Sequence, residues 1–343
     1  MTEVALGLGT FGDVTRDAKG KTHSFAHVIR DVLAQAVLAE EVGVDAMVLG
    51  EHHRDDFAIS TPETLLAGIA SQTSNIILSS GVTVLSSDDP VRIFQRFATV
   101  DALSEGRAEI ILGRGSFTES FPLFGYALED YQVLFEEKLS LFTELLKETP
   151  VNWSGTTRPP LTNQEVYPKS HSGAMRTWVG VGGSPESVVR AASFGLPLML
   201  AIIGGSADRF APYVDLYHRA LDQVGKPPQP IGVHSPGHIA ATDEEAIEGM
   251  WPHYEESFGR IGRERGWGPR SKDDYLNEVH HGALYVGSAE TVAKKMAATI
   301  KTLGISRFDL KYSTGPMPHE VLMNSIELYG TTVIPMVRDI LAS

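Results

Sequence analysis

The chain has 343 residues, of which 42% are hydrophobic and 21% charged, and its formal net charge is −14. This composition is typical of a globular enzyme or binding protein, and the acidic balance argues against binding to nucleic acid or to anionic membranes, which need basic surfaces. The lack of cysteine excludes disulfides, thiolate metal sites and cysteine nucleophiles, and it fits a cytoplasmic protein.

Neither a targeting signal nor a membrane segment is expected. The N-terminal stretch "MTEVALGLGTFGDV" has no basic region followed by a long apolar run. No apolar stretch approaches the roughly 18 residues of a membrane span.

Short apolar strands alternate with amphipathic helices in the first half of the chain. In chain order, the predicted strands are 4–11, 45–50, 75–85 and 107–115. The predicted helices are 24–43, 61–73, 89–106 and 130–148. Thr61 before Pro62 and Asp89 before Pro90 mark two helix starts, because a polar cap followed by proline is typical of a helix N-terminus.

The second half repeats the alternation. The predicted strands are 177–183, 196–205, 229–241 and 307–313. The predicted helices are 184–195, 207–224, 288–304 and 319–341. Two segments exceed the repeat, one rich in proline, threonine and serine (150–175) and one charged (242–281), and both are predicted to be loop insertions rather than domains.

Eight strand–helix units predict an α/β fold, a (β/α)8 TIM barrel forming a single domain over 1–343. Apolar strands without alternation are typical of a parallel sheet covered by helices. A doubly wound open sheet is the alternative, and the glycines of "GLGTFG" at the first strand invite it. Those glycines do not lead directly into a helix, so the dinucleotide-binding fingerprint fails.

In a barrel of this kind the active site lies at the carboxyl ends of the strands. There the stretch "GVGGSPES" offers Gly182 and Gly183 for close backbone approach, with Ser184 as helix cap and Ser187 in the first turn. Arg114 in "GRG" ends a neighbouring strand and suits a phosphate. These residues indicate a phosphate-bearing ligand; the alternative is that Ser184 only caps a helix and Arg114 only forms a surface ion pair.

The stretch "GEHHR" places His52 and His53 side by side after the second strand. Adjacent strand residues point to opposite faces, so the pair is poorly placed to share a metal ion, and no metal ligand is expected. One imidazole in the barrel mouth is predicted to act as a base or hydrogen-bond donor. A structural hydrogen bond is the alternative, and it is preferred for His280 and His281 in a predicted loop.

The sequence resembles the bacterial luciferase-like flavin-dependent monooxygenases. The matching stretches are "VLGEHHR", "GVTVLSSDDPVRIFQRFATVDALSEGRAEIILGRG", "VGGSPESVVRAASFGLPLML" and, more weakly, "GALYVGSAETVAKKM". Agreement is strong over 4–125 and 178–205 and moderate over 282–337, while 206–281 matches nothing specific. The resemblance implies a (β/α)8 barrel, usually a homodimer, that holds FMN or a deazaflavin at the carboxyl ends of the strands.

The resemblance also implies roles for individual residues. Arg114 would meet the FMN phosphate together with Ser184, Ser187 and the Gly183 backbone, and a non-proline cis peptide is implied at Gly81–Val82 beneath the flavin ring. Further expected cofactor-binding residues are Gly182, Gly204 and Gly205. The essential histidine of the luciferases corresponds to His52, with His53 beside it. The luciferases have a glutamate before the phosphate-binding serine where this chain has Gly183, so backbone N–H groups are expected to replace that contact.

The function implied is that of an FMN-dependent monooxygenase. Reduced FMN, delivered by a separate flavin reductase, would react with O2, and one oxygen atom would enter a small organic substrate. Lys311 and Tyr312 either touch this substrate or are merely exposed, and the two insertions are candidate lids. The alternatives are a deazaflavin-dependent hydride-transfer enzyme, a non-catalytic flavin-binding protein and, more distantly, a metal-dependent barrel hydrolase.

Overall fold

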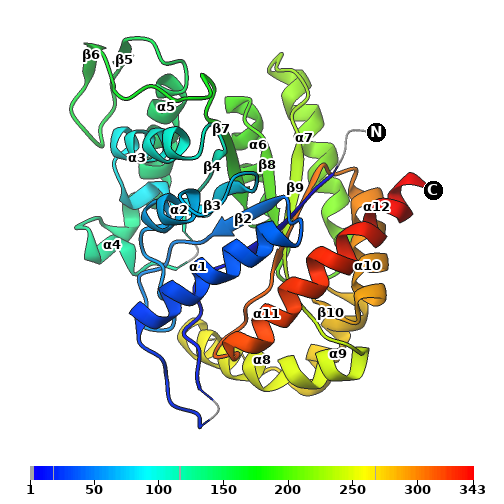
Figure 1. Ribbon diagram of the computed structural model, residues 1–343. Coiled ribbons are helices and arrows are strands. Elements are labelled where there is room, and N and C mark those ends of the chain that lie inside the picture. The colour runs from blue at the N-terminus through cyan, green and yellow to red at the C-terminus, as the bar shows by residue number, and fades with distance from the viewer. Residues whose placement is uncertain (1–3, 18, 116, 267) are drawn as a thin grey trace.

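The computed structural model describes residues 4–17, 19–115, 117–266 and 268–343, and its centre is a closed barrel of parallel strands surrounded by helices (Figure 1). The barrel strands are β1 (Ala5–Thr10), β2 (Ala46–Leu49), β3 (Ile77–Val84), β4 (Ala108–Gly113), β7 (Arg176–Val181), β8 (Leu198–Ala201), β9 (Ile231–Ile239) and β11 (Arg307–Lys311). Each coincides with a predicted strand, so the predicted (β/α)8 barrel is confirmed and the open sheet is excluded.

Strand pairing shows how the barrel closes. The order runs from β1 through β2, β3, β4, β7 and β8 to β9, which also pairs with β11, and β11 pairs with β1. A short strand that the sequence analysis missed, β10 (Tyr285–Gly287), pairs with the end of β9. All pairings in this sheet are parallel, so the carboxyl ends of the barrel strands meet at one end.

The helices follow the predicted pattern. They are α1 (Phe25–Glu41), α2 (Pro62–Ala70), α3 (Pro90–Leu103), α5 (Tyr131–Leu145), α6 (Pro185–Phe194), α7 (Ala211–Gln223), α10 (Ala289–Leu303), α11 (His319–Leu328) and α12 (Ile334–Ala342). A wider π-helical turn separates α11 from α12 where one continuous helix was predicted. Asp89 and Ser184 cap α3 and α6 through their side chains, whereas Thr61 precedes α2 without a side-chain cap bond.

The two insertions are more ordered than predicted. The first contains an antiparallel pair, β5 (Val151–Trp153) and β6 (Leu161–Gln164). The second, predicted to be a loop, contains α8 (Asp243–Arg265) and α9 (Lys272–His281), so His280 and His281 lie in the last turn of a helix and their assignment to a loop was wrong.

The charged composition of the second insertion concealed a narrow apolar stripe. Ala246, Met250 and Tyr254 recur every four residues along α8 and are buried against Tyr275 of α9. Ser271 and Asp274 form a capping box that starts α9. Local caps and the packing of this one stripe therefore support two helices in a strongly polar stretch.

The barrel interior is polar at its base and apolar above it. Arg307 Nε donates to Asp309 Oδ1 at 2.6 Å, and its Nη1 lies 3.4 Å from Glu109 Oε1. All three side chains are almost fully buried, and their mutual pairing offsets part of the cost of removing charges from water.

Above this ion cluster lies an apolar layer that forms the floor of the barrel mouth. Its members are Val48, Ile111, Trp178, Met199 and, partly buried, Val82. A second, larger core lies between the strands and the surrounding helices.

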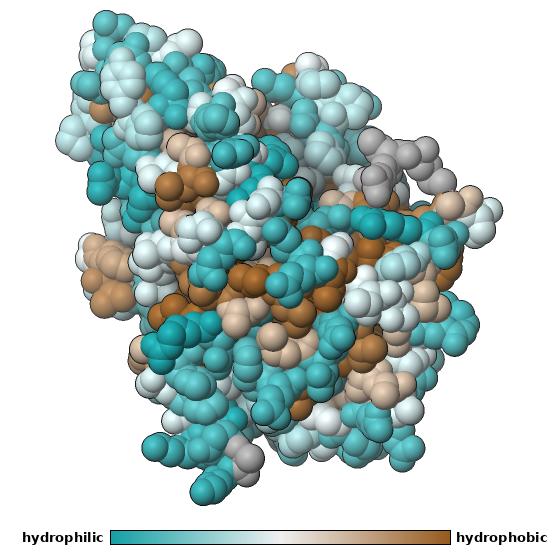
Figure 2. All heavy atoms as spheres, in the orientation of Figure 1, coloured by the Kyte–Doolittle hydropathy of each residue, from teal (hydrophilic) through white to brown (hydrophobic). Residues whose placement is uncertain are grey.

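No helix in the described parts of the chain is long and apolar enough to cross a membrane. The face in Figure 2 is mostly hydrophilic, with apolar patches along the side covered by α1 and α11. Phe25 and Ile29 of α1 are among the large apolar side chains that remain exposed.

A buried histidine predicts how stability depends on pH. Burial on β9, reinforced by nearby His253, lowers the pKa of His238 to about 4. An unfolded histidine has a pKa near 6.5, so the unfolded state binds an extra proton as the pH falls below that value, and folding weakens. When the pH falls from 7.5 to 5.5, the free energy of unfolding should therefore decrease by about 1.3 kcal/mol less in His238→Gln than in the unsubstituted protein. Urea titrations at both pH values measure this difference, and parallel losses would contradict it.

Candidate active site

A cavity of about 410 Å³ opens at the carboxyl ends of the barrel strands. Almost every barrel strand contributes lining residues at or just beyond its end, and α8 closes one side. Lining residues from the barrel strands and the turns that follow them include Phe11, His52, Val82, Arg114, Gly182, Ala201, His234 and Lys311. The polar residues predicted from strand ends therefore do converge, because parallel closure brings those ends together.

The wall of the cavity depends on three glycines around Val82. The Gly81–Val82 peptide bond is cis, as the resemblance implies. A Cβ atom at Gly113 would lie 2.5 Å from Val82 Cγ2, and one at Gly180 would lie 2.8 Å from Val82 Cγ1. A Cβ at Gly81 would overlap Val48. Glycine at 113 and 180 leaves room for the Val82 side chain between β3, β4 and β7, and glycine at 81 leaves room for Val48.

His52 lies in an aromatic pocket. Its ring centroid is 4.5 Å from that of Phe11, 4.6 Å from Phe57 and 5.0 Å from Phe117. Burial there, together with the positive charge of Lys311, lowers the pKa of His52 to about 3. The imidazole is neutral at pH 7, so it can accept a proton or donate an N–H hydrogen bond, but it is not an imidazolium acid.

His53 points to different partners. Its Nε2 lies 2.9 Å from Glu51 Oε1, and its ring meets Phe124 edge-on at 5.0 Å. The other carboxylate oxygen of Glu51 accepts the Val84 N–H at 2.8 Å, which ties the β2 loop to β3. The two histidines thus have separate surroundings, as strand geometry predicts, although both line the cavity.

A second polar cluster lies where β4 and β7 end. Arg114 Nη2 donates to Ser187 Oγ at 3.0 Å, and the Ser184 hydroxyl donates to the same oxygen at 2.8 Å. Because Ser187 Oγ already accepts two hydrogen bonds, its own hydrogen remains available to a ligand. The Arg114 guanidinium lies over the Tyr131 ring at 5.0 Å, and among the described residues it pairs with no carboxylate. The alternative that Arg114 is a surface ion-pair partner is therefore not what the structure shows.

The predicted glycines differ in position. Gly182 lines the cavity, and Gly183, with φ of +97°, turns the chain into the N-terminus of α6. Gly204 and Gly205 do not belong to the cavity lining of the described chain. The Gly205 N–H instead donates to both carboxylate oxygens of Glu278, at 3.2 and 3.0 Å, so it is committed to α9.

Lys311 and Tyr312 also separate. Lys311 lines the cavity, lies 4.6 Å from the Phe11 ring centroid and donates to Asp13 Oδ2 at 3.1 Å. Tyr312 is fully buried on the opposite face of β11, where its hydroxyl donates to Gln35 at 2.7 Å. The view of both as exposed residues was wrong, because successive side chains of a strand point to opposite faces of the barrel wall.

The sequence analysis assigned no role to several residues that shape the mouth. His234 stacks on Phe11 at 6.1 Å, and burial lowers its pKa to about 4. From α8, the residues at the cavity are Ser257, Phe258, Ile261 and Arg265. His234 lies within β9 (Ile231–Ile239), level with Ala201 at the end of β8, so its place in the mouth follows from strand register rather than from a strand end. Nothing local marked the residues of α8.

Ion pairs hold α8 across the mouth. Arg54 donates to Asp56 at 2.8 Å, to Glu119 at 2.7 Å and to Glu264 of α8 at 2.6 Å. Arg16 pairs with Glu256 of α8 at 2.6 Å. No residue of the first insertion lines the cavity described here, so the proposed lid at 150–175 is not supported, while 242–281 does border the mouth.

Comparison with known sequences identifies a matching family and relatives that align over most of the chain. A model of the family described as luciferase-like monooxygenase matches residues 8–307. N-acetyl-S-alkylcysteine monooxygenase of Bacillus subtilis is 29% identical, over 84% of this chain and 88% of its own length.

Two solved structures share the fold at low sequence identity. The oxygenating constituent of 3,6-diketocamphane monooxygenase from Pseudomonas putida, in complex with FMN, has a TM-score of 0.79 and 20% identity, covering 98% of this chain and 99% of its own. An F420-dependent secondary alcohol dehydrogenase has a TM-score of 0.76 and 18% identity, covering 98% of this chain and 100% of its own. The family model spans most of the barrel and includes every strand end that forms the cavity except that of β11. The chain therefore belongs to the luciferase-like monooxygenase family.

Proposed function

We propose that the protein is an FMN-dependent monooxygenase that uses reduced FMN and O2 to oxygenate a small organic substrate. One observation carries the proposal: Arg114, which pairs with no carboxylate among the described residues, and Ser187 in the first turn of α6 line the same apolar cavity as the neutral imidazole of His52. An anion-binding end and a largely dry end in one cavity suit a ligand with a phosphate and an extended ring.

The anion-binding end fits a phosphate. Arg114 supplies a positive charge, Ser187 an available hydroxyl hydrogen, and α6 the partial positive charge of its N-terminus. Ser184 acts through Ser187, since its hydroxyl donates to that oxygen and also accepts the Ser187 N–H. Gly183, in place of the glutamate of the luciferases, avoids a negative charge beside this position. Gly204 and Gly205 have no part in this cradle.

The other end fits a flat aromatic ring. Val82 and the glycines around it give a smooth wall, and Ile111 and Met199 continue that wall as part of the apolar layer below. A side chain larger than hydrogen at Gly113 or Gly180 would displace Val82 and fill the space beside it.

His52 is the proposed proton-handling group. Its neutral ring faces the cavity from among three phenylalanines that exclude water, so it can take a proton from substrate or hydrogen-bond a developing negative charge there. Lys311 is held by Asp13 and keeps a positive charge near the ring of His52, which favours the neutral imidazole. His53 acts as a positioning residue through Glu51.

FMN, when bound and reduced, supplies the electrons that activate O2, and the chain supplies binding, orientation and exclusion of water. The FMN complex of 3,6-diketocamphane monooxygenase supports this choice of cofactor. The F420 adduct in the structurally similar alcohol dehydrogenase supports the alternative, hydride transfer from a deazaflavin. Titration with each cofactor separates the two: saturable F420 binding without FMN binding would contradict our proposal.

The proposal also includes a source of reduced FMN, a location and an oligomeric state. Reduced FMN would come from a separate flavin reductase, and the active form would be a cytoplasmic homodimer of one-domain chains. Adding a reductase and NAD(P)H should replace chemically reduced FMN in the assay, and sedimentation should give twice the chain's mass.

The reaction class can be tested with isotopically labelled O2. Reduced FMN is mixed with the protein and a panel of aldehydes, ketones and alkanes, and products are analysed by mass spectrometry. One labelled oxygen atom per product molecule is expected. Cofactor oxidation with no labelled product from any substrate class, in protein that binds FMN, would favour the non-catalytic alternative.

Arg114→Gln should weaken FMN binding about 10- to 100-fold, because a charge-assisted hydrogen bond to phosphate contributes about 1.5–3 kcal/mol. Riboflavin, which lacks the phosphate, should bind the variant and the unsubstituted protein equally. Flavin fluorescence titration measures both affinities. Arg92→Gln is the matched control, since Arg92 is an exposed arginine of α3 that bonds Gln95. Equal losses for riboflavin and FMN would contradict a phosphate contact.

His52→Gln should lower turnover by about 100- to 10,000-fold, the usual contribution of a positioned proton-transfer group, and leave FMN affinity within about threefold. His53→Gln is the matched comparison and should lower turnover less than about tenfold, because the His53 ring is hydrogen-bonded to Glu51.

Since the pKa of His52 is about 3, the pH profile of the rate should show no acid limb near pH 6.5 due to this group. An acid limb near pH 6.5 that disappears in the His52 variant would show that His52 titrates there, and it would contradict the low pKa of this imidazole.

A further inference from the structure

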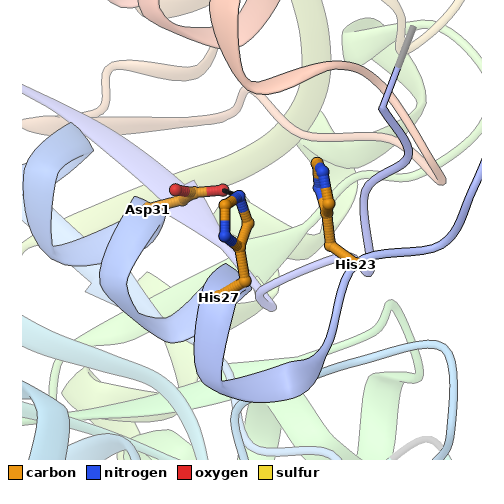
Figure 3. Close-up of side chains that lie close together, drawn as sticks. All are labelled: His23, His27 and Asp31. Atoms are coloured by element: carbon orange, nitrogen blue, oxygen red, sulfur yellow. Dashed lines mark ion pairs between the residues drawn. The ribbon is translucent and has the colours of Figure 1, made fainter. Parts of the chain in front are cut away.

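Three side chains suited to metal binding lie together outside the cavity, at the start of α1 (Figure 3). His23 directly precedes the helix cap Ser24, and His27 and Asp31 follow at helical spacing of four residues. One candidate ligand atom from each residue lies within 4.8 Å of the other two. We propose that His23, His27 and Asp31 bind a divalent transition-metal cation, with Zn²⁺ as the representative ion.

The spacing of the ligand atoms fits a tetrahedral ion. His27 Nε2 and Asp31 Oδ2 are 3.4 Å apart. Two ligands bound to Zn²⁺ at about 2.0–2.1 Å with tetrahedral angles are separated by roughly 3.3–3.4 Å. The His23 and His27 ring centroids are 4.1 Å apart, so a small rotation of the His23 side chain would complete three ligands and leave one position for water.

The His23 ring is already oriented by a neighbour. Thr15 Oγ1 lies 2.9 Å from its Nδ1, which leaves Nε2 as the atom free to bind a cation. Metal-binding histidines usually hold their second nitrogen in a hydrogen bond of this kind, which fixes the ring and its tautomer.

Asp31 supplies an independent observation. Its Oδ2 is buried and has no hydrogen-bond partner among the described residues. Two imidazole nitrogens lie close to it, His27 Nε2 at 3.4 Å and His319 Nδ1 at 3.9 Å, and neither forms a hydrogen bond with it. A buried carboxylate oxygen without a hydrogen-bond partner needs a cation or a water molecule beside it. The imidazoles of His23 and His27 next to Asp31 favour a metal ion, because imidazole and carboxylate are both ligands of divalent transition metals.

The position of the site suggests what the ion would do. The connection between β1 and α1 carries Asp13, which holds Lys311 in the cavity, and Arg16, which pairs with Glu256 of α8. A cation joining His23 to α1 would fix this connection at its far end. None of the three ligands lines the cavity, so metal binding can be tested separately from flavin binding.

The test uses full-length, tag-free protein treated with EDTA and dialysed. Isothermal titration with Zn²⁺ should give one ion per chain, and Co²⁺ should develop the visible absorption of a tetrahedral site. His27→Gln and Asp31→Asn should each weaken Zn²⁺ binding at least tenfold. His27 is the more informative position, since its side chain is 45% exposed and its replacement should leave the fold intact by circular dichroism.

His218→Gln on α7 is the matched control, because it removes an exposed histidine far along the chain and should bind Zn²⁺ as the unsubstituted protein does. Zn²⁺ should also raise the melting temperature of this control and of the unsubstituted protein, but not that of His27→Gln. Absence of saturable binding, or equal affinities for His27→Gln and His218→Gln, would overturn the proposal and leave His27 and Asp31 as an ion pair.

Discussion

The side chain of Val82 occupies space that only glycine leaves on the two neighbouring strands, and the shape of the barrel mouth depends on this fit. Gly113 and Gly180 accept its two methyl groups at distances that a Cβ atom would make impossible. The interior of a closed eight-stranded barrel is normally filled by layers of side chains. Here the ion cluster and the apolar layer fill the lower part, and glycines keep the upper part open. Missing side chains at defined strand positions therefore keep the cavity open, and α8 closes one side of it.

Local electrostatics in the mouth differ from those of the whole chain. The net charge of −14 disfavours anions in general, yet Arg114 and Lys311 bring positive charge to two sides of the cavity. Burial keeps His52 and His234 neutral, because desolvation opposes the charged imidazole and the positive charge of Lys311 lowers both pKa values further. One cavity can thus attract an anionic group near Arg114 and hold neutral imidazoles near Lys311.

Prediction from the sequence was wrong about the charged stretch 242–281, which was assigned to a loop because of its polar composition. The charged stretch 242–281 gave no helical signal strong enough to outweigh its composition, and its helices depend on caps and on packing against β10. The prediction that His52 and His53 would have separate surroundings agrees with the structure, whereas His280 and His281 lie in helix α9 rather than in a loop. The pair that does converge, His23 and His27, is spaced by four residues and was missed. Its third member, Asp31, lies one further turn along the same helix.

Local pattern predicted the eight strand–helix units, the caps of α3 and α6 and the polar residues at strand ends. The cis peptide at Gly81–Val82 was predicted through a family resemblance. The pattern did not show which of the polar residues share the cavity: in the folded chain Lys311 and Gly182 line it, and Tyr312 and Gly205 do not. The neutral state of His52 and the position of α8 at the mouth likewise became clear only in the folded chain. Burial, pKa and contact arise from groups that are distant in sequence, such as Phe117 beside His52 and Glu264 beside Arg54.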